Sequence, residues 1–185
     1  MPFTAGQRLL ASQLNSNMPQ LLGSTILTGS QASISLSTAG GGTNALTVTW
    51  QARSDNASPA TFMMLQFNGD TGNDYLWQIM QANVASTSGT ANSGALTSAI
   101  EIGTMTAAQA TANFFSAGEF VITNPLSTTA YKSCSGHATS IVTATNSYTG
   151  TYGGLWQSTA AITSITLKPQ AGNFVAGTMV TIYGI

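Results

Sequence analysis

The stretch from Trp156 to Ile185 decides the fold class, because it holds two strand-like segments separated by a polar link. It begins Trp-Gln-Ser-Thr-Ala-Ala-Ile-Thr-Ser-Ile-Thr-Leu-Lys-Pro, continues through a link at 170–176, and ends Gly-Thr-Met-Val-Thr-Ile-Tyr-Gly-Ile. Both segments alternate and are rich in β-branched residues, which predicts β-strands. Pro169 cannot donate a ladder hydrogen bond, so the first strand should end before it. We expect the second to be an interior strand, because an exposed edge invites aggregation.

Composition limits the partners of the protein. The 185 residues include four Lys and Arg and five Asp and Glu, so only 5% are charged, against roughly 25% in typical soluble domains. A surface so poor in cations cannot supply the phosphate contacts on which nucleic-acid affinity depends. The sequence also has no apolar run of about 18 residues. We therefore expect no nucleic-acid partner and no membrane insertion, and a surface largely covered by other subunits of an assembly.

The first residues and the cysteine content indicate where the protein is made. Met1-Pro-Phe-Thr-Ala-Gly-Gln-Arg lacks the apolar core of a secretory signal peptide. The single cysteine, Cys134, excludes an internal disulfide framework. We expect synthesis in a reducing cytoplasm and, if the protein acts outside a cell, release by lysis.

Residues 1–22 differ from the remainder and predict an N-terminal anchor segment ahead of a β domain at 23–185. Apolar residues at the spacing of one face of a short helix are Leu10, Leu14, Met18 and Leu21. Two turns of helix are too short to be stable alone in water. The segment could fold back on its own domain or dock into a neighbouring subunit, and we favour the subunit contact.

The remainder of the sequence predicts about nine or ten short strands separated by turns. Besides those of the C-terminal stretch, the candidate segments for these strands are 25–27, 32–36, 46–51, 61–67, 75–81, 95–103, 119–123, 130–133 and 138–144. Residues 107–115 are expected to be irregular, and residues 147–154 to form a Gly-rich aromatic loop. This spacing, without a long helix, favours an all-β fold, an antiparallel β-sandwich or jelly roll with a short N-terminal helical segment.

The turn from Asn68 to Asp74 offers oxygen ligands for a metal. Asn68, Asp70 and Asp74 are the candidates. The EF-hand pattern fails, however, because Gly72 stands where a third ligand belongs and no bidentate Glu follows at the right spacing. The glycines, Asn and Asp are also what a tight turn requires. We therefore predict no metal site, and no cofactor.

Two further groups of residues suggest catalysis. Cys134 and His137 lie three apart in an extended segment, a poor arrangement for activating a thiol. The carboxylate pairs that could serve a glycosidase are Asp70 with Glu101 and Asp74 with Glu119. Nothing in the sequence brings either pair together, and we predict no catalytic residue.

The aromatic residues fall into two classes. Those inside strand patterns, which should be core, are Trp50, Trp77 and Trp156. Tyr148 and Tyr152 lie instead in the expected Gly-rich loop, close to Asn146. Exposed rings among Asn, Thr and Gly can stack on a sugar face and hydrogen-bond its hydroxyls. These tyrosines are candidate glycan contacts, with Asn146 beside them, or they cap the sandwich.

Several blocks resemble small tail-associated proteins of tailed bacteriophages. They are Phe3-Thr-Ala-Gly-Gln with Leu10-Ala-Ser-Gln-Leu-Asn15, Phe67-Asn-Gly-Asp-Thr-Gly-Asn-Asp-Tyr-Leu-Trp77, Gly154-Leu-Trp156, Ala161-Ile-Thr-Ser-Ile-Thr-Leu167 and Gly177-Thr-Met-Val-Thr-Ile-Tyr-Gly-Ile185. The blocks keep the same order and compatible spacing over most of the chain, departing at Asp74. The resemblance implies a jelly-roll virion protein, usually a minor tail or tail-fibre component and a homotrimer, without an implied activity.

Three functions are therefore expected, in this order. The first is a bacteriophage structural protein of the tail or tail fibre that contacts the host surface through its glycans. The second is a capsid decoration or head-fibre protein that stabilises the shell. The third is a glycan-cleaving enzyme on a fibre. The first two place the protein in the virion beside other virion proteins, and the sequence does not choose between head and tail.

Overall fold

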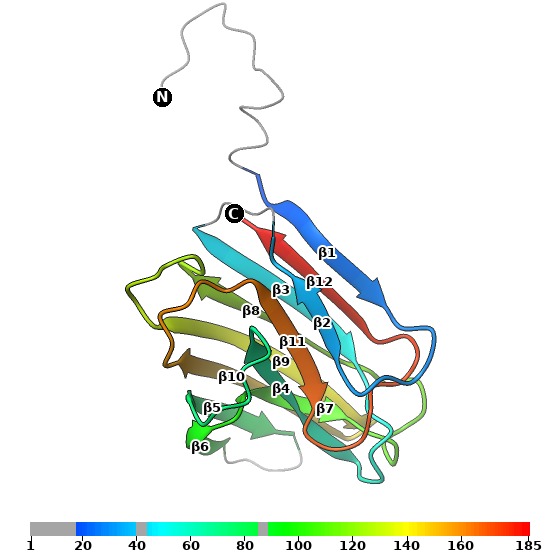
Figure 1. The fold of residues 1–185 in the computed structure, drawn as a ribbon. Helices are drawn as coiled ribbons and strands as arrows, with labels where there is room; N and C mark the ends of the chain where they lie inside the picture. Colours follow the sequence, from blue (N-terminus) through cyan, green and yellow to red (C-terminus); the bar gives the residue numbers. More distant parts are fainter. Residues whose placement is uncertain (1–17, 40–43, 85–88) are drawn as a thin grey trace, which may run out of the picture.

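The computed structural model describes residues 18–39, 44–84 and 89–185, which form two antiparallel β-sheets packed face to face (Figure 1). The larger sheet contains eight strands in the spatial order β1 (Gln20–Ile26), β12 (Met179–Gly184), β3 (Ala45–Ala52), β8 (Ser116–Thr123), β9 (Lys132–Thr143), β10 (Asn146–Trp156), β5 (Tyr75–Asn83) and β6 (Gly89–Thr97). The smaller sheet contains β2 (Ile34–Ser37), β11 (Ser164–Pro169), β4 (Ala60–Phe67) and β7 (Ile100–Thr106). The all-β sandwich predicted from the sequence is confirmed.

The C-terminal strand β12 lies inside the larger sheet, as predicted. It pairs antiparallel with β1 on one side and with β3 on the other. The preceding strand β11 extends through Pro169, one residue further than expected, and Pro169 pairs with Met63 as the last residue of the strand. Proline lacks the N–H but keeps the carbonyl, so it is tolerated at a strand end.

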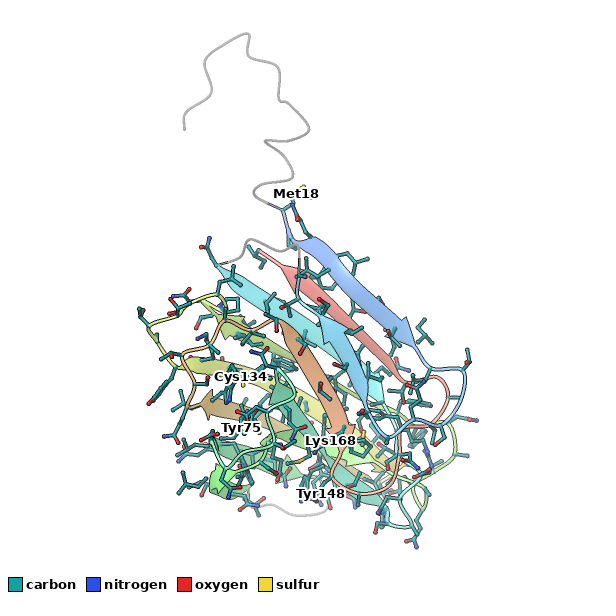
Figure 2. The ribbon with its side chains drawn as sticks, in the orientation of Figure 1. Met18, Tyr75, Cys134, Tyr148 and Lys168 are labelled. Carbon is teal, nitrogen blue, oxygen red and sulfur yellow. The ribbon has the colours of Figure 1, made fainter. Side chains whose placement is uncertain are left out.

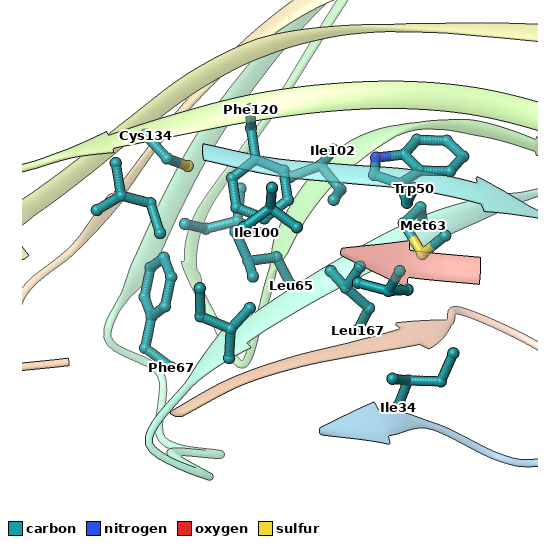
Figure 3. Packing of buried hydrophobic residues seen from close by; sticks show 14 of the residues in the cluster. Ile34, Trp50, Met63, Leu65, Phe67, Ile100, Ile102, Phe120, Cys134 and Leu167 are labelled. Carbon is teal, nitrogen blue, oxygen red and sulfur yellow. The ribbon is translucent and has the colours of Figure 1, made fainter. Parts of the chain in front are cut away.

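Alternation along the strands directs one row of side chains into the space between the sheets. Trp50 and Trp156 are each 2% exposed, so their assignment to the core is confirmed, whereas Trp77 is partly buried and packs against the core. Core residues seen in Figure 3 come from both sheets and are Ile34, Trp50, Met63, Leu65, Phe67, Ile100, Ile102, Phe120, Cys134 and Leu167.

Three strand predictions were wrong in their boundaries. The expected strand at 95–103 is the end of β6, a turn, and the start of β7, while the expected strands at 130–133 and 138–144 belong to the single strand β9. The expected loop at 147–154 is the middle of β10. Its glycines are sites of close contact: a Cβ on Gly150 would lie 2.7 Å from the Met80 carbonyl oxygen, and one on Gly154 would lie 2.5 Å from Ile100 Cγ2. Glycine in a strand can therefore mark close packing as well as a turn.

Residues 107–115 are irregular, as expected, and Arg53 holds them in place. One guanidinium nitrogen of Arg53 donates to the carbonyls of Thr111 and Phe114 at 2.8 and 2.9 Å. The other donates to the carbonyls of Ala108 and Ala110 at 3.3 and 3.1 Å. These four bonds satisfy carbonyls that no sheet ladder reaches.

The start of the described chain corrects part of the expected anchor. Leu21 lies in β1 rather than in a helix, and the strand already begins at Gln20, so the β domain starts before residue 23. Met18 and Leu21 are 57% and 62% exposed. Leu10 and Leu14 lie outside the described residues.

Candidate functional site

The two tyrosines proposed as glycan contacts lie in a strand, and Tyr152 is part of the core. Tyr152 is 4% exposed, and its hydroxyl donates to the Glu119 carbonyl oxygen at 2.8 Å. Burial raises the pKa of Tyr152 above its ordinary value. The prediction of an exposed ring at Tyr152 was therefore wrong, because even-numbered positions of β10 face the smaller sheet.

Tyr148 and Asn146 occupy even-numbered positions at the start of β10. Tyr148 pairs with Asn83 and Ser140 and is half-buried (Figure 2). Asn146 is also half-buried, and among the described residues its buried Oδ1 has no hydrogen-bond partner. Two tyrosines that share the inner side of one strand cannot form an outward stacking platform, so this glycan site is not retained.

The turn between β4 and β5 uses its polar side chains to hold the fold. The side-chain amide of Asn68 donates to the Ala161 carbonyl at 2.8 Å, and its Oδ1 accepts the Thr163 N–H at 2.7 Å. Asp70 accepts the Trp156 indole N–H at 2.7 Å on Oδ2 and the Gly72 N–H at 2.8 Å on Oδ1. Among the described residues no group of three or more His, Cys, Asp or Glu side chains is arranged to hold a metal.

Asp70 closes one end of the core by fixing Trp156. The Trp156 ring lies 5.6 Å from the Phe67 ring and 6.3 Å from the Tyr75 ring, centroid to centroid. The Tyr75 hydroxyl donates to the Asp70 carbonyl at 3.2 Å. The segment 67–77, which the sequence singled out, thus joins β4 of the smaller sheet to β5 of the larger sheet, and its Asp70 and Tyr75 fix the end of β10 at Trp156.

Asp70→Asn should lower the free energy of unfolding by about 1 kcal/mol, because an amide offers one acceptor oxygen to the two N–H donors that Asp70 binds. Asp74→Asn is the matched control in the same turn and should change stability by less than about 0.5 kcal/mol. Urea titration followed by tryptophan fluorescence measures both. Equal losses in the two variants would contradict the assigned role of Asp70.

Cys134 and His137 point to opposite faces of β9. Cys134 is 5% exposed in the core, and burial raises the pKa of its thiol to about 12. The His137 side chain is 61% exposed, and its Nδ1 lies 3.8 Å from Glu119 Oε1. An odd spacing along a strand separates a thiol from an imidazole across the sheet, so these two side chains form no nucleophile–base pair.

Three of the four carboxylates suggested as glycosidase pairs lie in separate surroundings. Asp70 binds Trp156, and Glu119 faces His137. Glu101 is 3% exposed within β7, where every residue is buried, and burial raises its pKa to about 7. The sequence suggested the residue types but held no signal for the burial of Glu101.

The outer face of the larger sheet is a broad surface with almost no charge. Register places one straight row across it, made of Met80, Thr151, His137, Glu119, Thr49 and Thr181. Of the Asp, Glu, Lys and Arg residues in the described strands of this sheet, Glu119 alone stands at an outward position of the register, since Lys132 is buried. This face is the candidate functional site.

The face is hollowed beside Met80, which is 68% exposed. A shallow depression of about 610 Å³ is lined by Met80, Gln81, Ala82, Gly89, Thr90, Ala91, His137, Thr149, Gly150 and Thr151. A second depression, of about 480 Å³, also includes Met80 and Thr151 and extends toward Leu76 and Leu155. The sequence signal for this hollow is Gly89, Ala91, Ser93 and Ala95, which puts a small residue at every second position of β6.

Comparisons with known proteins identified no relative, so the function of the protein is inferred from its fold and from this face. No protein-family model, curated protein or solved structure matches the chain. Among the described residues no helix is long and apolar enough to span a membrane.

Proposed function

We propose that the protein is a structural protein of a tailed bacteriophage particle, a tail or tail-fibre component that assembles as a homotrimer and takes part in contact with the host surface. The blocks at 3–15, 67–77 and 154–185 support this assignment by their resemblance to small tail-associated proteins. The β-sandwich agrees with the jelly-roll fold that the resemblance implies.

The observation that carries the proposal is the outer face of the larger sheet. Among the described strands it presents mainly Thr, Ser, Ala and Gly with scattered larger apolar side chains, and the Asp, Glu, Lys, Arg and His residues at outward positions of the register are His137 and Glu119. Surfaces that stay in water usually carry interspersed charges of both signs. A neutral face of this breadth is better suited to covering by other subunits than to permanent exposure.

The positions of the chain ends support attachment at one end of the sandwich. Gln20 pairs with Gly184, and the Ile185 N–H donates to the Ala45 carbonyl at 3.0 Å, so the first strand begins where the last one ends (Figure 1). A particle contact through residues 1–22 would then leave the far end of the domain free. The exposed Met18 and Leu21 side chains are available for such a contact.

The test is the location and copy number of the protein in particles of the phage that encodes it. Particles are banded on a density gradient, quantified by mass spectrometry, and labelled with gold-conjugated antibody for electron microscopy. Label at the tail and a few copies per particle support the proposal. Hundreds of copies over the head identify a capsid decoration protein instead, and particles without the protein overturn a virion function.

A further inference from the structure

A shallow hollow lies at one rim of the outer face of the larger sheet. Its volume of about 310 Å³ is at the lower end of the range for small-ligand pockets, roughly 300–1,000 Å³. Three lining residues stand at outward positions of β3, β8 and β9, and three belong to the segment that joins β7 to β8. In chain order they are Gln51, Asn113, Phe114, Phe115, Ala117 and Ile141. We call this feature the Phe114 hollow; it shares no lining residue with the two depressions beside Met80.

The wall of the Phe114 hollow is fixed by the rest of the fold. Arg53 donates to the carbonyls of Thr111 and Phe114 at 2.8 and 2.9 Å, which holds the segment between β7 and β8 in place. Phe115 lies against the loop before β12, where a Cβ on Gly177 would be 3.3 Å from its Cζ. A preformed wall loses little conformational freedom when a ligand binds, and this favours affinity.

The lining combines aromatic rings with unpaired carboxamides. Phe114 and Phe115 are partly exposed, and Gln51 and Asn113 are exposed. Among the described residues neither Gln51 nor Asn113 has a side-chain hydrogen-bond partner. Aromatic rings pack against the apolar faces of sugars, and a carboxamide both donates and accepts hydrogen bonds, as sugar hydroxyls do. The hollow therefore holds both kinds of group that recognise a saccharide.

The charges around the hollow are unsuited to an acidic ligand. Among the described residues that line it, none is Asp, Glu, Lys, Arg or His. The guanidinium of Arg53 is already bonded to four carbonyls. Glu119 places a carboxylate two positions from Ala117 on the same side of β8. A sugar with carboxylate or phosphate groups would meet like charge and no unpaired cation, so the fitting ligand is an uncharged saccharide.

The Phe114 hollow lies at the end of the sandwich opposite to the ends of the described chain. Gln20 pairs with Gly184 at one end of the larger sheet, whereas Gln51 pairs with Met179 at the other, where β3 ends and β12 begins (Figure 1). An anchor at residues 1–22 would therefore turn the hollow away from the particle.

We propose that the Phe114 hollow binds an uncharged saccharide of the host surface. The two phenylalanine rings contact the sugar, and the two carboxamides hydrogen-bond its hydroxyls. This inference rests on the host contact in the proposed function and names its site and its ligand class. It places that site on the β7–β8 segment and the ends of three strands rather than at 146–152 of β10.

Binding is first tested on an array of purified bacterial surface polysaccharides and neutral oligosaccharides, with the fluorescently labelled full chain as the probe. We expect the chain to bind one or more uncharged glycans. Binding to none of them overturns the inference, and so does binding confined to acidic glycans.

Three substitutions then test whether the bound glycan occupies the hollow. Asn113 has a φ of 66°, a left-handed conformation that glycine adopts readily, so Asn113→Gly removes the amide and keeps the backbone path. Gln51→Ala removes the other amide from an exposed position. Each should weaken binding about three- to tenfold, measured by titration calorimetry with the glycan found on the array. Phe114→Leu should have an effect of similar size, because it removes a ring and keeps an apolar side chain.

Matched controls make the same changes elsewhere on the protein. Asn124→Gly replaces another exposed Asn of positive φ, 47°, at the opposite end of the sandwich. Gln78→Ala replaces an exposed Gln of β5 that lines a depression beside Met80. Both should bind as tightly as wild type, and circular dichroism checks the fold of every variant.

Wild-type affinity in all three hollow variants overturns the site. Loss of binding in Gln78→Ala with Gln51→Ala unaffected also overturns it, because the glycan then lies beside Met80. The virion location is decided separately by labelling of particles. A protein that is present in particles and binds no uncharged glycan overturns this inference alone, whereas a protein that binds through the hollow and is absent from particles overturns the virion function alone.

Discussion

Replacing Tyr152 by Ala is expected to lower the free energy of unfolding by about 4 kcal/mol, the loss typical of a large aromatic side chain removed from a packed core. The Tyr152 ring is 4% exposed, and its hydroxyl bonds to the Glu119 carbonyl of the strand β8. Guanidinium chloride unfolding followed by circular dichroism measures the loss. A shift of the transition midpoint without a change of slope would show that the native state itself is destabilised.

Two control variants separate the ring from its hydroxyl and from surface effects. Tyr152→Phe keeps the ring and should cost about 1 kcal/mol, because the Glu119 carbonyl loses its donor. Tyr131→Ala removes a ring that is 54% exposed, so it should change stability by about 0.5 kcal/mol or less. If Tyr152→Ala unfolds at the same denaturant concentration as Tyr131→Ala, the ring does not belong to the core.

Replacing Glu101 by Gln is expected to raise the free energy of unfolding by about 3 kcal/mol at pH 8 and to leave it nearly unchanged at pH 4. Burial raises the pKa of Glu101 from its ordinary value of 4.5 to about 7. Between these values the folded protein keeps a proton that the unfolded chain releases, so stability falls as pH rises from about 4.5 to about 7. Gln resembles the protonated acid and cannot ionise, which removes this loss.

The measurement is thermal or urea unfolding of both proteins at pH 4, 6 and 8. Glu119→Gln is the matched control, since the Glu119 side chain is 50% exposed and should add less than about 0.5 kcal/mol at any of these pH values. Parallel pH dependence in wild type and Glu101→Gln would show that Glu101 ionises without cost. It would then have a partner or solvent contact in solution.

The sequence by itself determined the fold class and the neutral character of the surface. Apolar and polar residues alternate at 46–51, 61–67 and 179–183. This pattern predicts a strand with one buried face, because successive side chains along a strand point to opposite sides. The interior position of β12 followed from the same reasoning, together with the rule that open edges are hazardous. Composition also predicts that the protein has no nucleic-acid partner, because so few cations supply few phosphate contacts, and this stays a prediction.

Only the tertiary structure decided where the aromatic and acidic residues point. The Gly-rich stretch at 147–154 has the composition of a loop, yet it forms part of β10 because neighbouring strands approach its glycines closely. Which side of β10 holds Tyr152 depends on the pairing of β10 with β5 and β9, which no local pattern records. Glu101 likewise looks like a surface residue in the sequence, but the whole of β7 is covered.

The sequence did not predict the candidate face, although the residue patterns that form it can be recognised in the sequence. Small residues alternate along β6, and Leu21 and Ile26 lie far away in the chain. That the depression beside Met80 and the exposed side chains of β1 lie toward opposite ends of one sheet follows from the strand order, which begins with β1 and ends with β6. Alternation is a local property of a few residues, whereas strand order and register arise from packing of the whole chain, and therefore only the structure could bring these residues into one surface.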